Sequence, residues 1–153
     1  MIRKKKSTKP KTIVVCSSVS FYKQALESEK SLKRLGFKVS LPISARKMEK
    51  TNNYDTSFYK PWFKNPADFK RKAFLMRDHF NKILKGDIVL VINLDKDGKK
   101  NYIGGNVLAE MAFGFYFKKP IFVLNVVQKD SPFYEEVFGM SPTFIQGDLS
   151  KIK

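Results

Sequence analysis

The chain has 153 residues, of which 42% are apolar and 14% aromatic, and 30 Lys and Arg against 14 Asp and Glu give a formal net charge of +16. This length suits one domain with a real core, and no stretch approaches the roughly 20 apolar residues of a membrane span. The single cysteine, Cys16, cannot form an internal disulfide. Since no Cys/His cluster has metal-ligand spacing, the sequence predicts no metal site.

The positive charge favours anionic partners without choosing among nucleic acid, a phosphorylated small molecule and an acidic protein. Most lysines are scattered along expected helices, which is equally typical of a solvated surface. Only residues 1–11 form a dense basic run, interpreted as a flexible tail capable of weak contact with nucleic acid. The apolar run after it is too short for a signal peptide, so we expect a cytoplasmic protein with one domain over residues 12–153.

In chain order, residues 12–16 are a β-branched run typical of a strand, and residues 20–35 carry apolar side chains at amphipathic helical spacing. Gly36 ends that helix, residues 37–41 alternate as a second strand, and Pro42 ends the strand. The pattern is lost over residues 43–64, which hold Pro61 and many aromatics. This stretch predicts a long loop that serves as a lid or binding segment.

Asn65 as N-cap and Pro66 at the first position then open a helix that should run to residue 85, before Gly86. Residues 87–93 are almost continuously apolar, as in a parallel strand buried on both faces. A glycine-containing loop over 94–105 leads to a helix at 106–117, a strand at 120–125 and a short fifth strand at 143–145. This order predicts an α/β fold: a Rossmann/flavodoxin-like, doubly wound, mainly parallel five-stranded sheet that binds ligands outside the carboxyl ends of its strands.

The segment after the first strand is the first candidate part of such a site. It contains Cys16, Ser17, Ser18 and Ser20, whose hydroxyl and backbone N–H groups could hold a phosphate or sugar oxygen. Simple helix capping by Ser18 or Ser20 uses the same groups, and the segment has no glycine-rich phosphate-binding signature. Both interpretations stay open.

Two further segments should meet the first at the same edge. Asn93 and Asp95 follow the central strand and could orient a ligand, or only shape the loop. Gly104 and Gly105 lack Cβ atoms and let the backbone approach a ligand closely. Glu110 follows in or just beyond the first helical turn, where the helix dipole favours its ionised form, although such a glutamate is also an ordinary feature of a helix start.

The residues KGDIVLVIN at 85–93, a polar loop, and GGNVLAEMAFGFYFKKPIFVL at 104–124 resemble the nucleoside 2-deoxyribosyltransferase-like superfamily, which includes 2′-deoxynucleoside 5′-monophosphate N-glycosidases. The resemblance covers nearly the whole chain after the basic tail. It implies that Glu110 is the nucleophile that attacks C1′, that no cofactor or metal is needed, and that the protein forms a homodimer or larger assembly. Aromatic side chains around one helix would suit such an interface, or pack within a monomer: Phe113, Phe115, Tyr116 and Phe117.

Two positions depart from the superfamily pattern. Members commonly carry an aspartate eight residues before Asp87 that handles protons, and this chain has His79 there with Asp78 beside it. Histidine can shuttle protons near neutral pH, but an ordinary helical histidine is an equal alternative. Gly104 stands where members often have a polar substrate-binding group.

Tyr102, Asn101 or Asn106 could replace the contact that Gly104 cannot make. The expected function is therefore cleavage or transfer at the N-glycosidic bond of a (deoxy)nucleoside or nucleoside 5′-monophosphate. In this hypothesis Ser17, Ser18 and Ser20 receive the 5′ end, and Asn93 or Asp95 orients the substrate. The alternative is a non-catalytic nucleotide-sensing or nucleic-acid-associated module on the same fold, which both departures favour.

Overall fold

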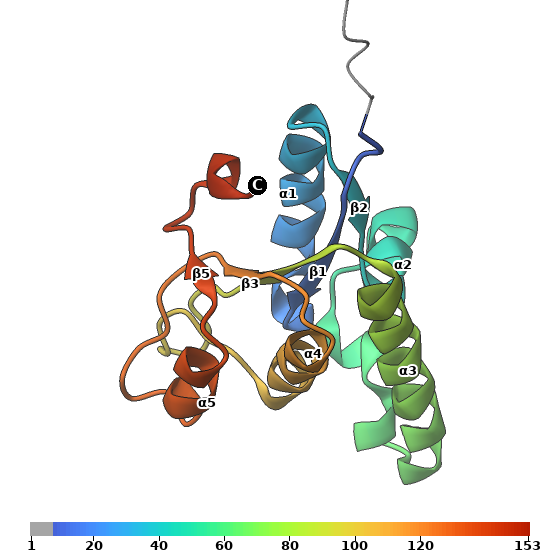
Figure 1. Ribbon diagram of the computed structural model, residues 1–153. Coiled ribbons are helices and arrows are strands. Elements are labelled where there is room, and N and C mark those ends of the chain that lie inside the picture. The colour runs from blue at the N-terminus through green and yellow to red at the C-terminus, as the bar shows by residue number, and fades with distance from the viewer. Residues whose placement is uncertain (1–7) are drawn as a thin grey trace, which may run out of the picture.

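The computed structural model describes residues 8–153, and within them five parallel strands form one sheet in the order β2-β1-β3-β4-β5 (Figure 1). The strands are β1 (Thr12–Ser17), β2 (Lys38–Ser40), β3 (Ile88–Ile92), β4 (Ile121–Val123) and β5 (Thr143–Phe144). All four pairings between neighbouring strands of this sheet are parallel. The predicted doubly wound α/β fold is confirmed, while residues 1–7 of the expected basic tail lie outside the described residues.

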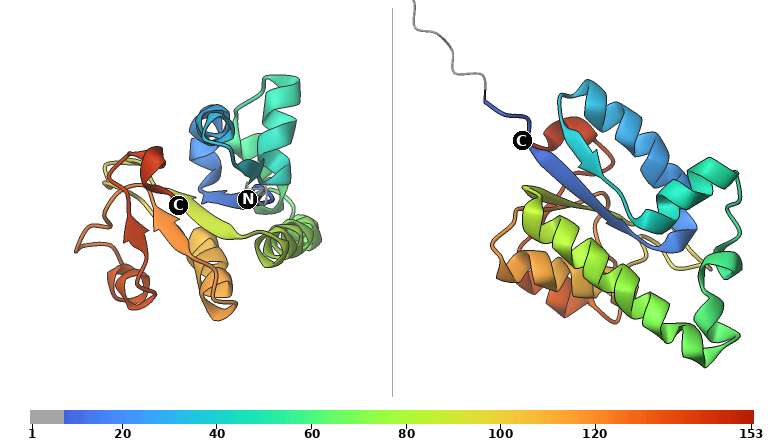
Figure 2. Two further views of the ribbon diagram at one scale, coloured as in Figure 1. Left: turned by 45° about the horizontal axis from the view of Figure 1, so that its top comes forward. Right: turned by 90° about the vertical axis from the view of Figure 1, so that its right-hand side faces the viewer.

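Helices cover both faces of this sheet. On one face lie α1 (Tyr22–Arg34) and α2 (Ile43–Thr51), and on the other lie α3 (Phe69–Lys85), α4 (Gly105–Tyr116) and α5 (Tyr134–Gly139) (Figure 2). All five residues of β3 are buried, because this strand is covered on both sides. After β1 the chain forms β2 on one side of the sheet, and after β3 it forms β4 on the opposite side. The order of strands therefore reverses between the neighbours β1 and β3.

Alternation along β1 divides the core into two clusters. Ile13 and Val15 belong to the cluster under α1 and α2, whereas Val14 and Cys16 belong to the cluster under α3 and α4. Successive strand side chains point to opposite faces, so this division follows from the pleat itself. It directs the Cys16 thiol toward α3 and α4 at the carboxyl end of β1.

A glycine brings α4 unusually close to the sheet. A Cβ at Gly114 would lie 2.9 Å from Cγ2 of Val89 in β3, so any larger residue would force the helix away. The Phe113 ring stacks on Phe80 of α3 at 4.8 Å between centroids, which packs α4 against α3 as well. These two contacts pack α4 against the sheet and against α3.

The prediction of a long loop over residues 43–64 was wrong. Residues 43–51 form α2, which buries Ala45 and Met48 and ends at Asn52 in the left-handed conformation, with φ of 51°. Two 3-10 turns follow, Thr56–Tyr59 and Pro61–Phe63, each anchored by one buried aromatic residue, Tyr59 and Trp62. The helix was missed because it is short and starts after Pro42 with no side-chain cap, so its apolar spacing gave a weak signal.

The other predicted elements agree with the structure to within a few residues, except that α5 was not expected. Asn65 caps the 3-10 turn Pro66–Asp68 by accepting from the N–H of Ala67 at 3.2 Å, and α3 continues directly from this turn to Lys85. The predicted helix at 20–35 begins with a 3-10 turn, Val19–Phe21, and continues as α1. Among residues 8–153, no helix combines the length and the apolar character needed to cross a bilayer.

The aromatic residues proposed for an oligomer interface differ in exposure. Phe113 is half-buried against Phe80, whereas Phe115, Tyr116 and Phe117 expose 52%, 78% and 41% of their surface. Three aromatic side chains thus stay accessible at the end of α4. Assembly into a dimer or a larger oligomer remains a prediction.

Candidate functional site

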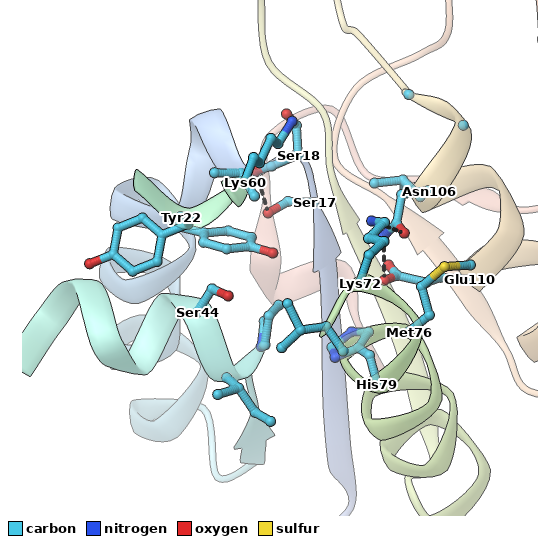
Figure 3. A pocket seen from close by; sticks show the side chains of 18 of the residues that line it. Ser17, Ser18, Tyr22, Ser44, Lys60, Lys72, Met76, His79, Asn106 and Glu110 are labelled. Atoms are coloured by element: carbon cyan, nitrogen blue, oxygen red, sulfur yellow. Dashed lines mark hydrogen bonds between the residues drawn. The ribbon is translucent and has the colours of Figure 1, made fainter. Parts of the chain in front are cut away.

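A cavity of about 180 Å³ opens at the carboxyl edge of the sheet, where the strand order reverses between β1 and β3. Its wall combines the end of β1, the first turns of α1 and α2, the aromatic segment around Tyr59 and Trp62, α3, the loop before α4, and α4 itself. This is the place where open α/β sheets bind their ligands. Figure 3 shows the two sides of the cavity, with Tyr22 and Ser44 across from Glu110 and His79.

Glu110 is the one acidic side chain among the described residues that line the cavity. It is 5% exposed, and its Oε1 accepts a hydrogen bond of 2.9 Å from Nδ2 of Asn106, one turn earlier in α4. Its Oε2 is buried and, within residues 8–153, has no hydrogen-bond partner. Lys72 of α3 donates to Oδ1 of Asn106 at 2.7 Å, so a chain of two hydrogen bonds joins Lys72, Asn106 and Glu110 (Figure 3).

The electrostatic expectation for Glu110 needs correction. We expected the helix dipole to favour the ionised carboxylate, but Glu110 lies beyond the first turn of α4, where that effect has faded. Burial instead raises its pKa to about 7, and the Cys16 thiol, the Lys72 charge and the Asn106 amide only partly oppose that rise. The carboxyl group is therefore divided between its protonated and ionised forms near neutral pH.

His79 lies deep in the same wall and makes contact with Cys16. The Cys16 Sγ and His79 Nε2 are 3.5 Å apart, and the imidazole is 3% exposed. Burial lowers the pKa of His79 to about 4, and the charge of Lys82 acts in the same direction. Its ring is therefore neutral at pH 7. Cys16 itself is fully buried and is not among the residues that line the cavity.

Asp78 is separated from the cavity although it neighbours His79 in sequence. Its carboxylate forms an ion pair of 2.9 Å with Lys82, one helical turn later, and it is not among the residues that line the cavity. On α3, consecutive side chains point about 100° apart, so only one of the pair can face α4. That residue is His79.

The serine segment divides between capping and the cavity. Ser18 accepts from the N–H of Ser20 at 3.4 Å, which is the predicted capping role, yet Ser17 and Ser18 also line the cavity. Lys96 approaches Ser18 as well, with 3.4 Å between Nζ and Oγ. Ser20 is exposed and outside the cavity.

Asn93 and Asp95 shape the loop and do not line the cavity. The fully buried Asn93 donates to the backbone carbonyls of Asn101 and Asn125 at 3.2 and 2.8 Å and accepts from the Asn125 N–H at 2.9 Å. Asp95 accepts from the Asn101 N–H at 3.0 Å. The interpretation as loop chemistry therefore fits both residues, and the loop that they hold carries Tyr102 to the cavity wall.

Of the substitutes considered for the polar group missing at Gly104, Tyr102 and Asn106 line the cavity. Asn101 instead donates its side chain to the carbonyl of Val126 at 2.8 Å. Gly104 and Gly105 both lie in the cavity wall, as expected from their place before α4. A Cβ at Gly105 would meet no described atom within 4 Å, so the space beside this position is open.

Three lysines in the wall were not foreseen: Lys60, Lys72 and Lys96. Burial, as the main cause, lowers the pKa of both Lys60 and Lys72. The Lys96 charge lowers the pKa of Lys60 further, which reflects two like charges at one end of the cavity. Only the aromatic character of residues 54–63 hinted at a binding segment, and it did not single out these lysines.

Comparison with known proteins adds no further assignment: no family model matches the chain, and no curated protein matches it. The superfamily resemblance seen in the sequence therefore remains a hypothesis.

Proposed function

We propose that this protein cleaves or transfers at the N-glycosidic bond of a (deoxy)nucleoside or nucleoside 5′-monophosphate, with Glu110 as the nucleophile. The observation that carries the proposal is the arrangement of hydrogen bonds around the Glu110 carboxylate beside the cavity. One oxygen is fixed by Asn106, the other has no partner among the described residues, and the cavity at the strand ends reaches the group. A positioned carboxylate with a free oxygen is what nucleophilic attack on a sugar carbon requires.

The chemistry would proceed in two displacements. A Glu110 oxygen forms a bond to C1′ while the C1′–N bond breaks, and the electron pair of that bond leaves with the base. The departing base takes up a proton. Water or a second base then attacks C1′ and releases the carboxylate, so the two acceptors give hydrolysis and transfer respectively.

His79 is better placed than Asp78 to assist the departing base, because only His79 lines the cavity. A neutral imidazole at pH 7 can still donate a hydrogen bond from one ring nitrogen. Burial disfavours the imidazolium form, so His79 enters the proposal as a hydrogen-bonding group more than as a charged acid.

The three cavity lysines favour a phosphorylated substrate over a neutral nucleoside. With Glu110 as the single acid among the described lining residues, the wall carries an excess of positive charge. Lys60, Lys96 and Ser18 lie at one end and supply donors suited to a phosphate, while Tyr22 and Trp62 offer aromatic surface. An anion would also reduce the repulsion between Lys60 and Lys96.

The test is release of free base from a panel of nucleosides and 5′-monophosphates, with and without an acceptor base. We expect release from wild type and none from Glu110→Gln, while Glu27→Gln, on the exposed side of α1, retains full activity. Lys60→Met should weaken use of monophosphates more than of nucleosides, whereas Lys30→Met should change neither. Equal release from wild type and Glu110→Gln would refute the proposed nucleophile.

A nucleotide-sensing module is the second candidate, and the lysine-rich wall favours it because anion binding by Lys60, Lys72 and Lys96 needs no turnover. Nucleotide binding with no base release from any substrate would support this candidate. Salt dependence separates it from an extended nucleic-acid contact, whose affinity falls steeply with ionic strength.

A further inference from the structure

The only cysteine and the only histidine of the 153-residue chain are in contact inside the core. Cys16 comes from β1 and His79 from α3, and the buried Glu110 of α4 joins them. One ligand atom from each side chain lies within 4.8 Å of the other two. Because the three residues come from three separate elements, no sequence spacing could have revealed this cluster.

The dimensions of the cluster suit a tetrahedral metal ion. Zinc bonds of about 2.3 Å to sulfur and about 2.0 Å to nitrogen, at the tetrahedral angle, place the two ligand atoms about 3.5 Å apart. The Cys16 Sγ and His79 Nε2 are separated by 3.5 Å. A carboxylate oxygen within 4.8 Å of both needs a shift of about 1 Å to complete a third ligand position.

An unpartnered oxygen in the cluster gives a cation a reason to bind. The Oε2 of Glu110 is buried and, in the part of the chain described, makes no hydrogen bond. The Nδ1 of His79 is also unpartnered, but Nε2 is the ring nitrogen that faces Cys16. An unpartnered buried polar atom is costly unless something binds it.

We propose that Cys16, His79 and Glu110 form a binding site for a divalent d-block cation, with zinc the best fit to a sulfur, nitrogen and oxygen ligand set. Three protein ligands leave the fourth position to water or a ligand, and Glu110 and His79 face the cavity from which either would come. Binding releases the thiol proton and, where Glu110 is protonated, the carboxyl proton to solvent. Thiolate and carboxylate then balance the two charges of the ion.

The metal site does not depend on the proposed glycosidic chemistry, but the two would compete for Glu110. A zinc ion bound to this carboxylate occupies the lone pair that attack on C1′ needs. Zinc should therefore inhibit base release, and a chelator should restore it.

The test uses the untagged full chain, freed of metal and titrated with Co²⁺, which adopts the same coordination and absorbs light. Because the chain has one cysteine, a thiolate-to-cobalt absorption band can come only from Cys16. We expect such a band to saturate at one ion per chain, with the intense visible bands of four-coordinate cobalt, and to disappear when Zn²⁺ is added. The absence of a thiolate band at several-fold excess of Co²⁺ would overturn the proposal.

Variants assign the remaining ligands. Cys16→Ser should abolish the band, and His79→Gln and Glu110→Gln should each weaken cobalt binding at least tenfold, while Glu27→Gln leaves it unchanged. Thermal unfolding of each variant shows whether the variant is folded. If a variant does not fold, the thiolate-to-cobalt band of the wild-type protein still decides whether the metal site exists. Metal binding is read by absorption and base release by product, so either proposal can fail while the other stands.

Discussion

The hydrogen bond from Asn106 to Glu110 gives the sharpest prediction about the proposed nucleophile. Asn106→Ala removes the 2.9 Å hydrogen bond to Oε1 of this carboxylate, and it also leaves Lys72 without its acceptor. A hydrogen bond to a charged group contributes about 1.5–3 kcal/mol. At 1.36 kcal/mol per tenfold in rate, base release should fall roughly 10- to 150-fold.

The assay is steady-state release of free base in the metal-free protein, with kcat and KM determined separately. We expect the loss mainly in kcat, because the bond orients the attacking oxygen and does not reach the rest of the substrate. The matched control is Asn81→Ala, the same change on the exposed side of α3. Base release within twofold of wild type in Asn106→Ala, with release abolished in Glu110→Gln, would refute the positioning role.

Three further predictions concern the scaffold. Gly86→Ala places a Cβ against Cγ2 of Val14 and 3.1 Å from the carbonyl oxygen of Lys82, and it should cost about 1–3 kcal/mol in urea unfolding. Val14→Ala in the same chain should relieve the part of this loss that comes from Val14. Gly105→Ala meets no described neighbour, so its thermal stability should match or exceed wild type while nucleotide affinity falls. The hydrogen bonds from Arg46 are the main cause that lowers the pKa of Glu29. This ion pair therefore stabilises the fold at pH values above the usual glutamate pKa of 4.5, and the stabilisation is lost as the pH falls below that value. The deficit of Glu29→Gln, about 1–3 kcal/mol at pH 7, should therefore shrink in acid unfolding profiles.

The sequence predicted the parts of the fold whose signals are local. The apolar run of β3 predicts a buried strand, and Asn65–Pro66 predicts the start of a helical segment. Both predictions were confirmed. The sequence did not predict α2, because this helix is stabilised by Ala45 and Met48, which pack in the core with α1, and not by a side-chain cap or a long periodic apolar face. Tertiary contact decided that segment, and the aromatic residues beside it suggested a loop instead.

The site was predictable only in outline. The switch-point rule and the glycines before α4 located the cavity, and the resemblance singled out Glu110. The contact between Cys16 and His79, 63 positions apart, depends on which face of β1 points to α3 and how α3 is rotated. Sequence spacing encodes neither quantity. The same holds for Lys60 and Lys72, which reach the cavity from segments with no shared pattern.

The position of Glu110 itself argues for function over packing. A buried carboxyl group with one oxygen unpartnered destabilises a fold, and an apolar side chain there would join Val107 and Met111 in the same cluster. The scaffold nevertheless holds α4 close to β3 through Gly114, where a Cβ would lie 2.9 Å from Cγ2 of Val89, so that either Val89 or the helix would have to shift. A close approach that keeps a costly group desolvated beside a cavity is typical of sites where chemistry or binding requires the group. Gly114→Ala should therefore disturb activity through the position of Glu110 as well as stability through Val89.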